Sequence, residues 1–85
     1  MYIVSVVDTN FVDYPSVMYH EDKHQLIKNM LEYLYKTYLD EMEECQRKKL
    51  RQVYENLYTD KYDETRIFNV LEDCGFLGTL INTDE

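Results

Sequence analysis

The chain has 85 residues, which is enough for one domain and too few for two. Its net charge is −8, from 17 Asp and Glu against 9 Lys and Arg. Charge of this sign repels phosphate backbones and anionic lipids, so we expect neither direct nucleic-acid binding nor membrane binding.

The remaining composition favours a folded protein of the cytoplasm. Hydrophobic residues make up 45% of the chain, which is enough to form a core. No stretch approaches the roughly 20 apolar residues of a membrane span, and the first residues lack the basic region of a signal peptide. Cys45 and Cys74 are too isolated for a disulfide framework, so we expect reduced thiols and no cofactor.

Two strands are predicted near the start of the chain. Residues 2–7 form a β-branched run in which both alternating sets of side chains are largely apolar, as in an inner strand. Residues 11–16 are expected to form a loop, because Pro15 disfavours helical geometry in the residue before it. A short second strand over residues 17–19 should run antiparallel to the first.

From residue 21 the apolar residues recur at helical spacing. One stripe on the predicted helix consists of Ile27, Leu31, Leu34, Tyr38, Met42 and Cys45. A second stripe follows and lies roughly 120° around the helix from the first. We therefore predict one long helix that bends or changes its buried face near residue 46. The second stripe consists of Leu50, Val53, Tyr54 and Leu57.

The length of this predicted helix conflicts with the size of the domain. A helix of about 35 residues would be about 52 Å long, whereas a compact domain of this size is only about 30 Å across. Either the helix breaks near Cys45, or its second half projects and is covered by another copy of the chain. In the second case Leu50, Val53, Tyr54 and Leu57 form a self-association surface, and we expect a homodimer.

The last part of the chain predicts a short helix and a final strand. Asp60 or Asp63 can cap a helix that buries Ile67, Phe68 and Leu71 and closes at Gly75. Residues 76–81 then form a strand. The chain is thus expected to be a single α+β domain over residues 1–85, with a small antiparallel sheet of about three strands and the order β-β-α-α-β.

One short motif points to metal chemistry. His20-Glu21-Asp22-Lys23-His24 fits the pattern H-E-x-x-H, in which two histidines on one helical face bind zinc. However, His20 is expected to end a strand, the intervening residues are charged, and no third histidine is present. We therefore expect a solvated helix start, no metal ligands and no catalytic residues. A zinc-dependent hydrolase remains a minor alternative.

The acidic residues bunch in short runs beside tyrosines, which supply rigid contact area at low entropic cost. The only basic cluster, residues 47–51, is expected to neutralise acids of the same chain or of a second copy, the alternative being contact with nucleic acid. Acidic runs beside tyrosines suit a basic protein partner, while the alternative is that the charge serves solubility alone. The predicted partner-binding residues are Asp40, Glu41, Glu43, Glu44, Asp60, Asp63, Glu64, Tyr33, Tyr58 and Tyr62.

In size, charge and aromatic content the whole chain is similar to the small acidic proteins that bacteriophages encode to block host enzymes. Some of those proteins imitate the charge of DNA. No motif carries this similarity, so it assigns no residue a role. It implies an inhibitor or adaptor that binds a basic, nucleic-acid-binding host protein, and not an enzyme. The main alternative is a structural or regulatory protein that pairs with itself through the long helix.

Overall fold

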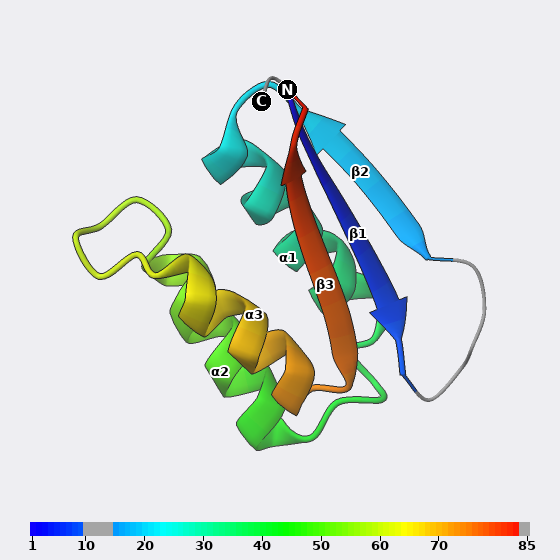
Figure 1. Ribbon diagram of the computed structural model, residues 1–85. Coiled ribbons are helices and arrows are strands. Elements are labelled where there is room, and N and C mark those ends of the chain that lie inside the picture. Colours follow the sequence, from blue (N-terminus) through cyan, green and yellow to red (C-terminus); the bar gives the residue numbers. More distant parts are fainter. Residues whose placement is uncertain (10–14, 84–85) are drawn as a thin grey trace.

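The structure, a computed structural model, describes residues 1–9 and 15–83, so most of the loop predicted over residues 11–16 lies outside the described residues. An antiparallel sheet and helices give the described residues the α+β class that the sequence predicts (Figure 1). The elements in chain order are β1 (Tyr2–Asp8), β2 (Ser16–His20), α1 (Lys23–Thr37), α2 (Glu44–Glu55), α3 (Glu64–Asp73) and β3 (Phe76–Asn82).

β1 is the central strand of the sheet, whose order is β2-β1-β3. Both neighbours run antiparallel to β1, and Val4 pairs with Met18 on one side and with Leu80 on the other. Val4 and Val6 are buried beneath the helices, which confirms the prediction of an apolar inner strand. The predicted second and third strands are confirmed as well.

The helices form two layers on one face of the sheet (Figure 1). α1 packs against β1 and β2, and α3 packs against β3. α2 packs against α1 and α3, and in the described part of the chain it has no packing contact with a strand. One continuous hydrophobic core extends from the sheet through α1 and α3 to the buried face of α2.

The predicted long helix is two helices, because the chain turns between α1 and α2 over residues 38–43, so of the two alternatives the structure has the break. The longest dimension of the molecule is 36 Å, so a helix of about 52 Å would not fit within it. Hydrogen bonds hold the corner. The Gln46 side chain accepts from the N–H of Glu43 at 2.9 Å, and Arg47 Nη1 donates to the carbonyls of Leu39 at 3.0 Å and Met42 at 3.2 Å.

The turn also changes the interpretation of the second apolar stripe. Leu50, Val53 and Leu57 were assigned to a self-association surface for the case of a projecting helix, whereas in the structure all three are buried in the core of a single chain. Tyr54 is partly buried at the edge of that core. Two stripes about 120° apart can both face one core once the helix carrying them folds back on itself.

The last helix begins and ends as predicted. Asp63 precedes α3, and its carboxylate accepts a hydrogen bond from the N–H of Arg66 at 3.2 Å. Gly75 follows the helix with a φ of 91°, a conformation that favours glycine. This turn leads directly into β3, which begins with the buried Phe76.

Candidate functional site

The sheet has a second face that no described residue of the helices covers. Side chains directly opposite each other on paired strands point to the same side of a sheet. The register places Ile3 between Tyr19 and Ile81, and Ser5 between Val17 and Thr79. We call this surface the open sheet face. It consists of Ile3, Ser5, Val7, Val17, Tyr19, Leu77, Thr79 and Ile81.

The open sheet face is apolar and exposed. Tyr19 is 71% exposed and Val17 59%, while Leu77 and Ile81 are 52% and 53% exposed. None of the residues that define the face is charged, although charged residues make up 31% of the chain. The only polar groups among them are hydroxyls. Contiguous exposed apolar patches of this kind mark interaction sites on soluble proteins.

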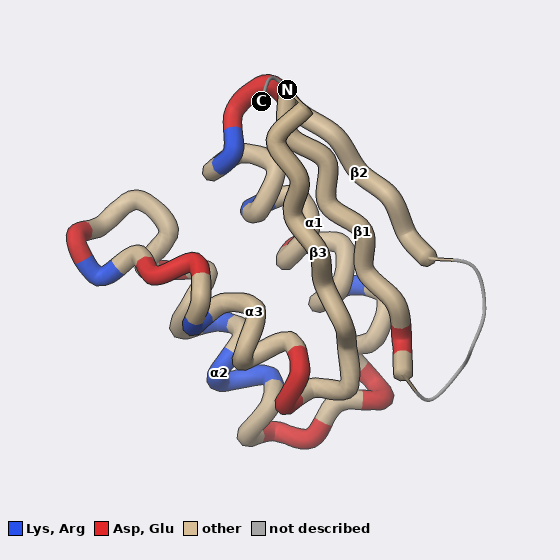
Figure 2. The backbone as a smooth tube through the Cα atoms, viewed as in Figure 1, with Lys and Arg blue, Asp and Glu red and all other residues tan. Residues whose placement is uncertain are grey.

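Acidic residues lie at both ends of the sheet. Asp8 is the last residue of β1, and the acidic pair Glu21 and Asp22 directly follows β2. Figure 2 shows acidic residues in red at both of these places. The apolar strip therefore lies between two negatively charged ends. A partner with an apolar centre and basic surroundings would match both features.

The two histidines of the H-E-x-x-H motif do not share a helical face. His20 ends β2, whereas His24 lies in the first turn of α1. Nδ1 of His20 accepts a hydrogen bond from the N–H of Asp22 at 2.8 Å, and the ring of His24 packs 4.3 Å from that of Tyr62. Among the described residues, no three His, Cys, Asp or Glu side chains are grouped to hold a metal ion.

The predicted acidic surface divides into two separate groups. Asp40, Glu41, Glu43 and Glu44 lie at the corner between α1 and α2, and Asp60, Asp63 and Glu64 lie beyond the other end of α2 (Figure 2). An α-helix of the length of α2 spans about 18 Å, so the two groups do not form one continuous site.

Several of these acids also have structural roles. Glu43 and Asp63 precede α2 and α3 as their N-terminal caps. Glu44 pairs with Lys48 at 3.9 Å, and Glu64 pairs with Lys23 at 3.1 Å. The sequence predicts that these acidic residues bind a partner. Their contacts within the chain show that they also serve to cap helices and to form ion pairs.

The three predicted interface tyrosines have different surroundings. Tyr58 is 65% exposed, and Tyr33 is 39% exposed with its hydroxyl 3.2 Å from the Ser16 hydroxyl. Tyr62 packs against the core. Its burial, together with the neighbouring carboxylate of Glu64, raises its pKa to about 12.

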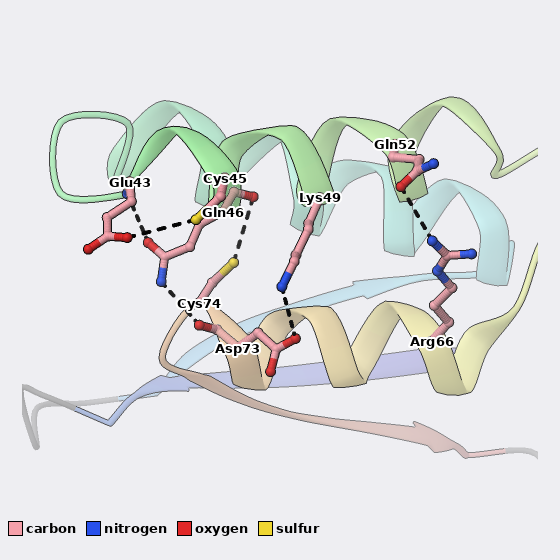
Figure 3. A network of polar contacts seen from close by, with 8 residues as sticks. All are labelled: Glu43, Cys45, Gln46, Lys49, Gln52, Arg66, Asp73 and Cys74. Atoms are coloured by element: carbon pink, nitrogen blue, oxygen red, sulfur yellow. Dashed lines mark hydrogen bonds and ion pairs between the residues drawn. The ribbon is translucent and has the colours of Figure 1, made fainter.

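The basic cluster joins α2 to the rest of the chain, as expected for intramolecular neutralisation. In Figure 3, Lys49 Nζ lies 3.6 Å from a carboxylate oxygen of Asp73, and Gln46 Nε2 donates to the Asp73 carbonyl at 3.1 Å. Arg66 on α3 donates to Gln52 Oε1 at 3.3 Å (Figure 3). These bonds fasten α2 to α3.

Both cysteines lie beside this network as free thiols. Cys74 is partly buried, and its Sγ donates to the carbonyl of Gln46 at 3.9 Å. Burial raises the pKa of the Cys74 thiol, so less of it ionises at neutral pH and it is a weaker nucleophile there.

Sequence reasoning placed Ile3, Ser5 and Val7 on one side of the first strand but did not recognise their exposed neighbours. The signal was present in the other two strands. Val17 and Tyr19 alternate with partly buried residues in β2, and β3 shows the same alternation. In a sheet with one buried face, the outward positions are usually polar or charged. Finding uncharged residues at all of these positions would have predicted the open sheet face.

Comparison with protein-family models, curated proteins and solved structures found no match. None of the helices in the described ranges has the length and apolarity needed to cross a membrane.

Proposed function

We propose that the protein is an interaction module that docks on another protein through the open sheet face. The observation that supports this proposal is the exposure of Val17, Tyr19, Leu77 and Ile81 on a surface without a charged residue. Burying such a surface removes apolar area from water and breaks no ion pair, so it favours association.

The partner that fits best is a basic protein, of the nucleic-acid-binding type that the sequence suggests. The net charge of −8 and the acidic ends of the sheet attract a basic surface and raise the encounter rate. The open sheet face then supplies the contacts that hold the complex. Under this proposal, charge sets the association rate and the contacts of the open sheet face set the dissociation rate. An inhibitor or adaptor works through such a complex without chemistry of its own.

A photo-crosslinking residue in place of Tyr19 tests which surface docks. The matched control carries the same crosslinker in place of Tyr58, which is 65% exposed against 71% for Tyr19 but lies on the connection between α2 and α3. We expect a basic protein to be captured from residue 19 and not from residue 58. Equal capture from both positions would contradict docking through the open sheet face.

The captured partner then allows rates to be measured. Tyr19→Ser should raise the dissociation rate, while Tyr58→Ser should leave it unchanged. Replacing Asp40 and Glu41 with Lys should lower the association rate, and added salt should reduce this difference because it screens charge over about 8 Å. An unchanged dissociation rate for Tyr19→Ser would refute the proposed face.

A second candidate is a homodimer in which two open sheet faces pack together. It is favoured by the fact that the face lacks the negative charge that would otherwise repel a second copy. Capture of the chain by itself from residue 19, with a dimer mass in solution that Tyr19→Ser reduces to the monomer mass, would select this candidate.

A further inference from the structure

α1 and α2 form a groove that shares no lining residue with the open sheet face. Its volume is about 430 Å³, which lies in the range of about 300–1,000 Å³ typical of small-molecule sites. The buried residues Leu31 and Leu50 line it, one from each helix. The remaining lining residues are Glu32, Tyr35, Lys36, Arg51 and Tyr54.

Two tyrosines are held in place in this groove by bonds across it. The hydroxyl of Tyr54 on α2 donates to Oε1 of Glu32 on α1 at 2.7 Å, and Arg51 Nη2 on α2 donates to the hydroxyl of Tyr35 on α1 at 3.1 Å. The bond to Glu32 raises the pKa of Tyr54, which favours the protonated hydroxyl that donates this bond. Rings fixed in this way lose little freedom when a ligand packs against them.

The groove has a basic end and an acidic end. The two hydrogen bonds place Arg51 beside Tyr35 and Tyr54 beside Glu32. Lys36 follows Tyr35 in the sequence of α1, so both lie about one helical turn beyond Glu32. Lys36 and Arg51 therefore belong to the same end. Neither forms an ion pair with an acid among the residues that the structure describes. At the other end, the carboxylate of Glu32 is bonded to Tyr54.

We propose that this groove binds a small organic anion with an aromatic body, independently of the docking function proposed above. The aromatic body packs between Tyr35 and Tyr54 over the leucines, and its carboxylate or phosphate lies at the basic end beside Lys36 and Arg51. The carboxylate of Glu32 repels an anion, and this fixes the orientation of the ligand in the groove.

Titration with 2-naphthoate and 2-naphthyl phosphate, followed by amide chemical shifts, tests the proposal. The neutral control probe is 2-naphthalenemethanol. We expect saturable shifts in residues 31–36 and 50–54 with at least one of the anions and weaker binding of the alcohol. The anion that binds more tightly identifies the charged group that the site prefers. Shifts confined to the open sheet face, or no saturable shift with either anion, would overturn the proposal.

Charge variants separate specific binding from general apolar contact. Lys36→Gln should weaken binding of the anion about fivefold, the upper end for an exposed ion pair, and Arg51→Gln should do at least the same. Lys48→Gln is the matched control, because it removes the same charge from α2 at a position that does not line the groove. In the described ranges, the Lys36 side chain has no hydrogen bond or ion pair, so its variant remains informative if Arg51→Gln disturbs the packing. Equal affinity of the Lys36→Gln and Lys48→Gln variants would overturn the role of the basic end.

Discussion

The ring of Phe68 on α3 lies directly over Gly78 in β3. A Cβ atom added at Gly78 would lie 2.8 Å from Cδ1 and from Cε1 of that ring, which is closer than carbon atoms pack. Glycine in a strand costs backbone entropy, and here it allows the helix to approach the sheet closely. Phe68 lies at the edge of the core, so this contact fixes how α3 sits on β3.

Gly78→Ala should lower the free energy of unfolding by about 1–3 kcal/mol, the usual cost of overpacking. The double variant Gly78→Ala, Phe68→Leu should recover part of this loss, because the smaller side chain leaves room for the added methyl group. Urea denaturation of the two single variants and the double variant measures both effects. Purely additive losses would show that the two residues do not compete for the same space.

Leu50→Ala should lower the free energy of unfolding by about 2–5 kcal/mol, because it removes a side chain that is buried within a single chain. Since Leu50 is covered within one chain, the denaturation midpoint of Tyr19→Ser, which cannot pair through the open sheet face, should be the same at low and high micromolar concentration. A midpoint of this variant that rises with concentration would favour pairing through α2, the alternative that the sequence left open.

Arg47→Met should destabilise the corner between α1 and α2 by about 1–2 kcal/mol, because the carbonyls of Leu39 and Met42 lose their charged donor. Lys48→Met is the control. Lys48 pairs with Glu44 at 3.9 Å, but both side chains are largely exposed, so its replacement should cost less than about 0.5 kcal/mol. Thermal unfolding of both variants makes the comparison, and equal losses would contradict the role of Arg47.

Tyr62 should ionise at about pH 12, well above the usual tyrosine value of 10. Because its pKa is raised in the folded state, the protonated hydroxyl stabilises the fold below pH 10, and this contribution is lost as the pH rises towards 12. Absorbance titration of the phenolates, with Tyr62→Phe as the reference, should show one group missing from the high-pH end. A titration of the variant that differs only near pH 10 would contradict this.

Local sequence patterns were enough to predict those helices and strands whose start and end are marked by residues nearby in the sequence. The β-branched run of residues 2–7 predicted the first strand and residues 76–81 the last one, and Asp63 with Gly75 marked both ends of the last helix. These signals depend on residues within one or two turns of the element that they define. The positions of the strands and of α3 could therefore be predicted from the sequence.

Local patterns could not locate the break between α1 and α2. Its strongest support is the side chain of Arg47, which folds back onto carbonyls of the preceding segment. No proline or glycine marks residues 38–43, and the residues there are compatible with a helix. The sequence therefore left open whether Leu50 and its neighbours face their own chain or a partner, and the groove between the two helices could not be foreseen.

The central position of β1 has a consequence for how the chain folds. β1 pairs on one edge with β2, which follows it closely in the sequence. Its other edge pairs with β3, which lies almost the whole chain away, as the pair Tyr2 and Asn82 shows. Pairings between such distant segments form slowly, because the intervening chain must first be brought together. During synthesis on the ribosome, an apolar strand with one unpaired edge is therefore present before its last neighbour exists. Such an edge can recruit other chains, and rapid packing of α1 on β1 would limit that exposure.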